Sequence, residues 1–239
     1  MSLRKIFFKT NLTTKVYLYY RLYIRQKFFL KKKQYSQWGE DLSISTFFKD
    51  IKKGTYLDVG AFHPYMFSNT CLLHQRGWSG INIDINPISI EMFKIARPSD
   101  INLCTTISES KKEFEMFYDG PFSTVNTLDK NFYKDYFKKD LNKKNKIFKI
   151  RSSSFKEIIE ANKIGRVIDF INIDVEGMDF EILQQIDIKN FKVKLISIET
   201  HKPNGDKSKS FELISNFLKN HNYVIYKRIG PTTLYILKT

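Results

Sequence analysis

Two short apolar runs, each ending in an acid and separated by enough residues for one helix, constrain this chain more than any other feature. The first is TYLDVGAFHP (residues 55–64) and the second is GINIDINP (residues 80–87). Two parallel strands need a crossover connection of about a dozen residues or more, so the spacing predicts a strand, a turn, a helix and a second parallel strand. In such units ligands bind at the carboxyl ends of the strands.

The same alternation continues along the rest of the chain. A helix is expected within residues 36–53, leading into the first strand. Further strands are expected over residues 56–59, 81–85, 101–106, 114–118, 147–151, 167–174 and 193–198, helices over 68–77, 87–96, 155–163, 179–186 and 211–220, and a final strand pair over 223–228 and 233–237. This order predicts an α/β fold with a doubly wound, mostly parallel sheet and a C-terminal antiparallel hairpin.

The charge is concentrated in an N-terminal arm. The formal net charge is +15, and residues 1–33 contain ten Lys or Arg and no Asp or Glu. We therefore divide the chain into a basic, aromatic arm (residues 1–34) and a body (residues 35–239), and we expect a lid insertion over residues 119–146. The arm is expected to be helical around residues 16–30. It could bind an anionic membrane surface, pack on the body or on a second copy, or, least favoured, bind nucleic acid.

The sequence gives several indications of the compartment. Cys71 and Cys104 lie in apolar segments without metal-ligand spacing, which favours two reduced core thiols. Apolar runs stay shorter than the 18 residues of a transmembrane helix. The arm also lacks the unbroken apolar region and cleavage site of a secretory signal. We expect a cytoplasmic protein, peripheral at the inner membrane face if the arm binds lipid.

Four of the expected strands end in polar side chains. These are Asp58, Asp84, Asp174 with Glu176, and Glu199 with His201. Because parallel strands place their carboxyl ends at one edge, these side chains are expected to converge. Carboxylates resist burial unless something pairs with them, so their convergence indicates a binding site.

The turn after the first strand indicates the kind of ligand. It carries Gly60 but lacks the three-glycine pattern that holds a pyrophosphate, which points away from NAD and towards S-adenosylmethionine. Asp84 could accept hydrogen bonds from two ribose hydroxyls or simply form a turn, and Asp58 could bind an ammonium group or hold the turn. The cofactor-binding candidates are Asp58, Gly60, Ala61, Asn69, Thr70, Asp84, Ile85 and Asp174.

The sequence DVEG (residues 174–177) supplies the candidates for chemistry. Asp174 and Glu176 would project to the same side if the strand stays extended. Together with the groups of the next strand they could bind a divalent cation such as Mg²⁺ or act as a general base. The catalytic candidates are Asp174, Glu176, His201 and His63, and the tentative metal ligands are Asp174, Glu176, Glu199 and His201. Residues 120–124 could line the site or form a turn.

Five segments in order resemble the FkbM family of S-adenosylmethionine-dependent methyltransferases. They are SQWGEDL, YLDVGAFHPYMFSNT, GWSGINIDINP, FSTVNTLD and INIDVEGMDFEIL, and they extend from about Tyr35 towards His201. The resemblance implies a class I methyltransferase fold and O-methylation of sugars in glycans or of natural-product hydroxyls. On this chain Asp58, Gly60 and Asp84 match the cofactor motif, and residues 174, 176 and 177 match the DVEG motif.

We therefore expect an S-adenosylmethionine-dependent O-methyltransferase that acts on a sugar hydroxyl in surface-glycan biosynthesis. Its partners would be a sugar or glycan acceptor, a membrane surface contacted through residues 1–33, and a second copy of the chain in a homo-oligomer. Two alternatives remain at this point: a nucleic-acid methyltransferase that tracks phosphates with the arm, and a non-catalytic adaptor of the same fold.

Overall fold

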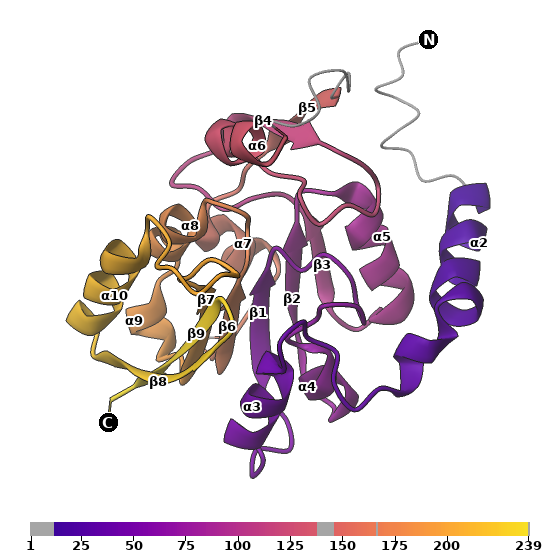
Figure 1. Ribbon diagram of the computed structural model, residues 1–239. Helices are drawn as coiled ribbons and strands as arrows, with labels where there is room; N and C mark the ends of the chain where they lie inside the picture. The colour runs from indigo at the N-terminus through magenta and orange to yellow at the C-terminus, as the bar shows by residue number, and fades with distance from the viewer. Residues whose placement is uncertain (1–11, 138–145, 166, 239) are drawn as a thin grey trace.

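The computed structural model describes residues 12–137, 146–165 and 167–238, and a seven-stranded sheet forms its centre (Figure 1). The strand order is β3-β2-β1-β6-β7-β9-β8. The strands are β1 (Thr55–Val59), β2 (Ser79–Asp84), β3 (Ile101–Cys104), β6 (Phe170–Ile173), β7 (Leu195–Glu199), β8 (Tyr223–Ile229) and β9 (Thr232–Leu237). The first five are parallel to one another, and β9 pairs antiparallel with both β7 and β8. The predicted doubly wound sheet with a terminal hairpin is confirmed.

Helices cover both faces of the sheet because the central strands are apolar on both sides. One face carries α7 (Phe155–Ala161), α8 (Asp179–Gln185), the short α9 (Ile188–Phe191) and α10 (Phe211–Asn220). The other face carries α3 (Glu40–Phe47), α4 (Cys71–Gln75) and α5 (Pro87–Ala96). Alternation along β1 shows the division: Leu57 and Val59 join the first core, and Tyr56 joins the second. Figure 1 shows the two groups of helices on either side of the sheet.

The arm forms a helical segment that packs on the body. It comprises α2 (Leu12–Tyr20), a π-helical turn (Arg21–Arg25) and a 3₁₀ helix (Lys27–Lys31). Leu18 and Leu22 are buried against Met92 of α5. The prediction that the arm is helical around residues 16–30 is therefore confirmed. The helix type changes along this segment from α to π and then to 3₁₀. The first eleven residues of the arm lie outside the described part of the chain.

A second, two-stranded antiparallel sheet lies near the carboxyl edge of the main sheet. Its strands are β4 (Glu113–Tyr118) and β5 (Lys146–Arg151), and α6 (Lys130–Phe137) belongs to the connection between them. Both strands were expected, but the sequence pattern did not separate them from the main sheet. Residues 138–145 of the expected lid lie outside the described residues.

Several expected boundaries shift. The helix expected within residues 36–53 covers 40–47, the one expected over 68–77 begins at Cys71, and β6 is shorter than residues 167–174. Cys71 is buried, but Cys104 is exposed because it ends β3, the outermost strand on that side of the sheet. The prediction of two core thiols is thus wrong for Cys104. Among the helices that the structure describes, none is long and apolar enough to cross a membrane.

Candidate active site

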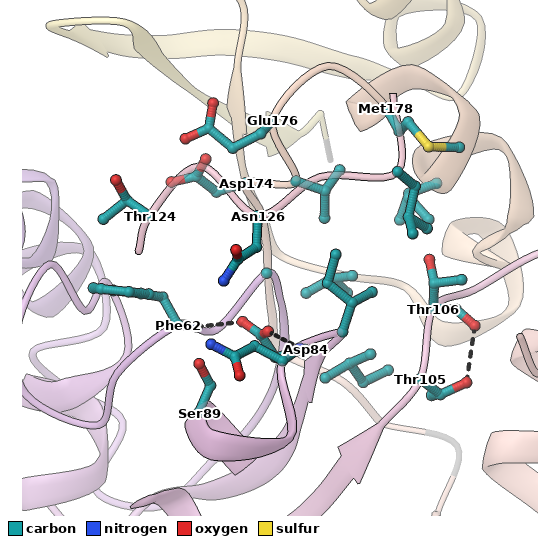
Figure 2. A pocket seen from close by; sticks show the side chains of 18 of the residues that line it. Phe62, Asp84, Ser89, Thr105, Thr106, Thr124, Asn126, Asp174, Glu176 and Met178 are labelled. Atoms are coloured by element: carbon teal, nitrogen blue, oxygen red, sulfur yellow. Dashed lines mark hydrogen bonds between the residues drawn. The ribbon is translucent and has the colours of Figure 1, made fainter. Parts of the chain in front are cut away.

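The strand order places a crevice beside β1. From β1 the chain builds β2 and β3 on one side and later β6 and β7 on the other. In open α/β sheets ligands bind outside the carboxyl ends of the strands at such a switch point. Two pockets lie there, with about 590 and 500 Å³ of space between protein atoms, part of it open to solvent. They share Gly60, Phe62, Thr124, Asp174 and Glu176, so they form two parts of one site. Figure 2 shows the side chains that line the larger pocket.

Gly60 forms the floor where the two pockets meet. Its backbone φ of +80° lies in the left-handed region, which strains any residue with a Cβ atom. A Cβ atom at this position would lie 1.8 Å from the carbonyl oxygen of Asp174. The amides of Gly60 and Ala61 both donate to the carbonyl of Ile83 (2.9 and 3.1 Å). The turn therefore brings the backbones of β1, β2 and β6 close together, and this approach requires glycine.

Asp84 ends β2 and forms one wall of the larger pocket. The backbone N–H of Phe62 donates to its Oδ2 (2.8 Å) and that of Asn86 to its Oδ1 (2.6 Å). Each carboxylate oxygen can accept a second hydrogen bond, so the group remains able to bind a ligand with two hydroxyl donors. Burial raises the pKa of Asp84 to about 6, although the two backbone donors act in the opposite direction.

Asp58 holds together the wall of the smaller pocket. The hydroxyl of Thr70 donates to its Oδ2 (2.7 Å), and the amide of Asn172 donates to its Oδ1 (2.9 Å). Asn172 in turn accepts a hydrogen bond from Nδ2 of Asn69 (2.9 Å). Oδ1 of Asn69 is buried without a hydrogen-bond partner, and burial raises the pKa of Asp58. The chain of bonds ends in an acceptor that a ligand N–H group would satisfy.

Carboxylates gather at the junction of the two pockets. Asp174 and Glu176 line both pockets, and Figure 2 shows them at the larger one. The side chain of Asp174 reaches solvent through the pocket, but protein surrounds the rest of it. This surrounding protein, together with the nearby carboxylates of Glu176 and Glu199, raises the pKa of Asp174 well above its ordinary value. Burial, with nearby Asp179, raises the pKa of Glu176 to about 7, and burial, with Asp179 and Glu176, raises that of Glu199 to about 8. Such groups can take up a proton near neutral pH.

The loop after β6 does not continue as an extended strand. β6 ends at Ile173, and Glu176 adopts a positive φ of +52°. Oδ1 of Asp179, the first residue of α8, accepts a hydrogen bond from the backbone N–H of Val175 (3.2 Å). The sequence predicts that an extended strand would bring Asp174 and Glu176 to the same side. The structure does not confirm this, because the strand ends before both residues. A tight turn, held by Asp179, directs both side chains to the site.

A loop over residues 119–129 closes the larger pocket. The amide of Asn86 donates to the carbonyl of Pro121 (2.9 Å), and the hydroxyl of Thr127 donates to the carbonyl of Glu176 (2.9 Å). Ser123, Thr124 and Asn126 line the pocket from this loop. The expectation that residues 120–124 could line the site agrees with this placement. The loop is tied to both β2 and the turn after β6.

The comparison with protein families agrees with the position of this site. The family model of the methyltransferase FkbM domain matches residues 58–225, which is well over half of the chain. The match begins at Asp58 in β1 and ends in β8. The chain belongs to the FkbM methyltransferase family. Searches of curated proteins and of solved structures returned no match at the significance required. The family assignment thus confirms the sequence resemblance and the methyltransferase class.

Most of the predicted cofactor-binding residues of this FkbM methyltransferase lie at the pockets. Ile85 and Asp84 line the larger pocket, and Ala61, Asn69 and Asp58 line the smaller one. Thr70 lies elsewhere: it is fully buried between Asp58 and Arg97, whose Nη1 donates to its hydroxyl (2.8 Å). Thr70 therefore supports the site from beneath. The carboxylate of Asp58 accepts hydrogen bonds from the side chains of Thr70 and Asn172, and not from backbone N–H groups of the turn as the sequence allowed.

The two predicted catalytic histidines lie outside both pockets. Nδ1 of His63 accepts hydrogen bonds from the backbone N–H groups of Tyr65 and Met66 (both 3.0 Å), and burial lowers the pKa of His63 to about 3. His201 is hydrogen-bonded to the hydroxyl of Thr200 (2.8 Å), and its ring packs on Phe211. Both rings are committed to local structure, so the geometry gives them no contact with the site.

The structure does not support the predicted metal site. Within the described residues there is no group of three or more His, Cys, Asp or Glu side chains arranged to hold a metal ion. His201 turns away because β7 ends at Glu199, and the next two backbone amides both donate to the carbonyl of Pro231 (3.0 Å each). Asp174, Glu176 and Glu199 remain as interacting carboxylates.

Several residues of the site were not singled out from the sequence. Thr105 and Thr106 follow β3, Gln37 precedes α3, Asn172 lies within β6, and Met178 follows the DVEG turn; all line the pockets. The threonines follow a strand at the same edge as Asp58 and Asp84, and that position was the available signal. Gln37 comes from a segment far from the strands, and only the fold brings it to the site.

Proposed function

We propose that this FkbM methyltransferase uses S-adenosylmethionine to methylate a hydroxyl group of a sugar acceptor, in the cytoplasm and in the biosynthesis of a surface glycan. The family assignment supplies the methyltransferase class. The identity of the methyl donor and the acceptor class are inferred from the chemistry of the two pockets. The observation that carries the proposal is the meeting of two pockets, one lined by Asp84 and apolar side chains and the other polar, at a junction of carboxylates with raised pKa values.

The residues present fit S-adenosylmethionine. In the larger pocket Asp84 would bind the ribose hydroxyls, and the apolar side chains of Ile85, Leu128 and Ile182 would contact the adenine ring. In the smaller pocket the unpartnered Oδ1 of Asn69 would accept a hydrogen bond from the ammonium group. Gly60 leaves room for the donor at the junction. When bound, S-adenosylmethionine supplies a sulfonium methyl group that an oxygen nucleophile can accept.

Glu176 is the best-placed general base. It lines both pockets, and its pKa of about 7 is close to physiological pH, where a general base is most effective. Its carboxylate would take the proton of the acceptor hydroxyl, which leaves the oxygen able to form a bond to carbon. Asp174 and Glu199 raise the proton affinity of the cluster and can share that proton.

The smaller pocket suits an acceptor rich in hydroxyl groups. Besides Asn69, which is assigned to the ammonium group, its lining is dominated by amide, hydroxyl and carboxylate groups, contributed by Gln37, Asp58, Ser68, Thr124, Asn172, Asp174 and Glu176. Phe67 also lines it, is exposed, and adopts a positive φ of +56°. Its ring lies nearly parallel to that of Phe62, 18° between planes. A sugar ring could place its C–H face on these aromatic rings and its hydroxyls on the polar groups.

Calorimetry and transfer of a labelled methyl group test the proposal together. Binding of S-adenosylmethionine is measured first, and then transfer to a panel of nucleotide sugars and glycan fragments. Asp84→Ala should weaken cofactor binding about 10- to 100-fold, since a charged acceptor of hydrogen bonds contributes about 1.5–3 kcal/mol. Glu176→Gln should keep cofactor affinity and lose turnover. The matched control is Glu181→Gln, which removes an exposed carboxylate of α8 and should change neither quantity.

Two results would contradict the proposal. A wild-type protein that does not bind S-adenosylmethionine would refute the choice of methyl donor. Full turnover in Glu176→Gln would remove this residue from the mechanism. If the cofactor binds and an acceptor other than a sugar is methylated, then the sugar assignment is wrong and the methyl donor is right.

A further inference from the structure

We propose that the outward face of the arm binds an anionic membrane surface. On this face we include the exposed apolar side chains Leu12, Val16, Tyr20, Ile24 and Phe28, which follow one another at intervals of four residues. Leu12, Val16 and Phe28 are 77, 61 and 60% exposed, so the protein covers less than half of each residue. Residues at this spacing lie about one helical turn apart, and we call these five exposed side chains the apolar stripe. Exposed apolar patches mark interaction sites.

The cations of the arm flank this stripe. Lys15, Arg25, Lys27, Lys31, Lys32 and Lys33 are all exposed, and residues 12–39 contain no Asp or Glu. Tyr17 and Tyr19 are exposed as well. Apolar side chains beside Lys, Arg and aromatic residues are the composition of helices that lie in the interface of an anionic bilayer. Each cation near such a surface adds roughly 1 kcal/mol.

The charge of this face favours lipid over the alternative occupants. In a symmetric dimer the same patch meets itself, so its cations would face cations without acidic partners. Nucleic acid would satisfy the cations, but phosphate offers nothing to Leu12, Val16 and Ile24. A bilayer with anionic headgroups satisfies both, because its acyl region takes the apolar side chains while its surface attracts the cations.

The inward face of the arm fixes this surface next to the catalytic pockets. The guanidinium of Arg21 lies 3.5 Å from the ring centre of Phe122, in the loop that closes the larger pocket. Because Nδ1 of His63 is an acceptor, its Nε2 carries the proton and donates to Oε1 of Gln26 (3.3 Å). His63 follows Phe62, which lines both pockets. A membrane bound by the outward face would therefore lie beside the site, and lipid-linked acceptors would be nearby.

Cosedimentation of the full chain with vesicles tests this inference without any assay of activity. Vesicles contain phosphatidylcholine alone or phosphatidylcholine with phosphatidylserine. The protein should sediment with the anionic vesicles and dissociate as salt is raised. Val16→Glu with Ile24→Glu should abolish binding, and Lys27→Gln with Lys31→Gln should weaken it about fivefold for each cation removed. All four side chains are exposed, so folding should be unchanged, which circular dichroism checks.

Matched substitutions on α10 serve as controls. Leu213→Glu and Lys219→Gln change an exposed apolar side chain and an exposed cation on a helix far along the chain from the arm. Both should leave vesicle binding unchanged. The inference is wrong if the wild-type protein ignores anionic vesicles, or if Val16→Glu with Ile24→Glu binds them as well as wild type. Self-association or RNA binding that the arm variants abolish, without vesicle binding, would also overturn it.

Discussion

Replacing Gly60 with alanine should destabilise the fold and disrupt the site together. An alanine in the left-handed region costs about 1–2 kcal/mol. Its Cβ atom would also lie 1.8 Å from the carbonyl oxygen of Asp174, and real Cβ atoms essentially never approach closer than 3.0 Å. The two backbones must therefore separate by at least 1.2 Å (3.0 − 1.8). That movement would break the hydrogen bond from Asp174 N–H to the carbonyl of Val59 (3.0 Å), which contributes about 1 kcal/mol or more when buried.

The expected loss for Gly60→Ala is thus about 3 kcal/mol or more. For a chain of this size that corresponds to a fall in Tm of roughly 6–12 °C. Gly77→Ala provides a matched control, because Gly77 has a φ of +89° but a Cβ atom there would meet nothing within 4 Å. It should lose only the backbone cost, about 1–2 kcal/mol. Urea unfolding measures both free energies, and calorimetry with S-adenosylmethionine measures the site, which only Gly60→Ala should damage.

If both alanine variants lose the same unfolding free energy, then the close approach of β1 and β6 at Gly60 does not constrain the fold. If Gly60→Ala also binds S-adenosylmethionine like wild type, then the turn does not shape the pocket.

Three further predictions concern charged groups. Because Asp84 has a pKa of about 6 and must be ionised to accept two hydroxyl donors, S-adenosylmethionine affinity measured by calorimetry should fall as the pH is lowered through 6; a flat profile would contradict its ribose role. The pKa values of about 7 for Glu176 and about 8 for Glu199 mean that the folded protein holds protons which the unfolded chain releases above 4.5. The stability they contribute is complete below that pH and is lost as the pH rises to 7 and 8, so the unfolding free energy of the ligand-free protein should decrease from about pH 4.5 to about pH 8, and less so in Glu199→Gln; an unchanged slope in that variant would exclude Glu199. Arg97→Met should lower the unfolding free energy by about 3 kcal/mol, because it removes a buried guanidinium that donates hydrogen bonds to the hydroxyls of Tyr56, Ser68 and Thr70. A loss below about 1 kcal/mol in urea unfolding would show that these hydroxyls find other partners.

Much of the main sheet was predictable because its signals are local. Each central strand is a short apolar run, and its spacing from the next strand leaves room for one helix. The acid at the end of β2 and the glycine after β1 follow from the same pattern, because parallel strands end at one edge. Asp84 and Gly60 could therefore be assigned to the site without knowledge of any contact.

The two histidines show where local signals fail. His63 and His201 both follow strands that end at the site, so position along the chain favoured them equally with the acids. Whether such a side chain enters the pocket depends on the path of the chain after the strand. His63 is held by the backbone of residues 65 and 66, and His201 is turned aside by the pairing of β7 with β9.

The arm shows a further limit. Its basic, aromatic composition indicated a helix but left open which of its faces would be covered. Packing on α5 decided this, because Leu18 and Leu22 fit against Met92 and leave the stripe from Leu12 to Phe28 in solvent. The proposal of membrane binding depends on this outward face, which exists only in the folded chain.

The sequence by itself determined the order of strands and helices, the family and the acids at the strand ends, because these depend on periodicity and spacing along the chain. The tertiary structure decided which of those polar groups share a pocket, because a side chain reaches a site only through turns and packing between distant segments. The raised pKa values of Glu176 and Glu199 arise in the same way, since burial and neighbouring carboxylates exist only in the folded chain.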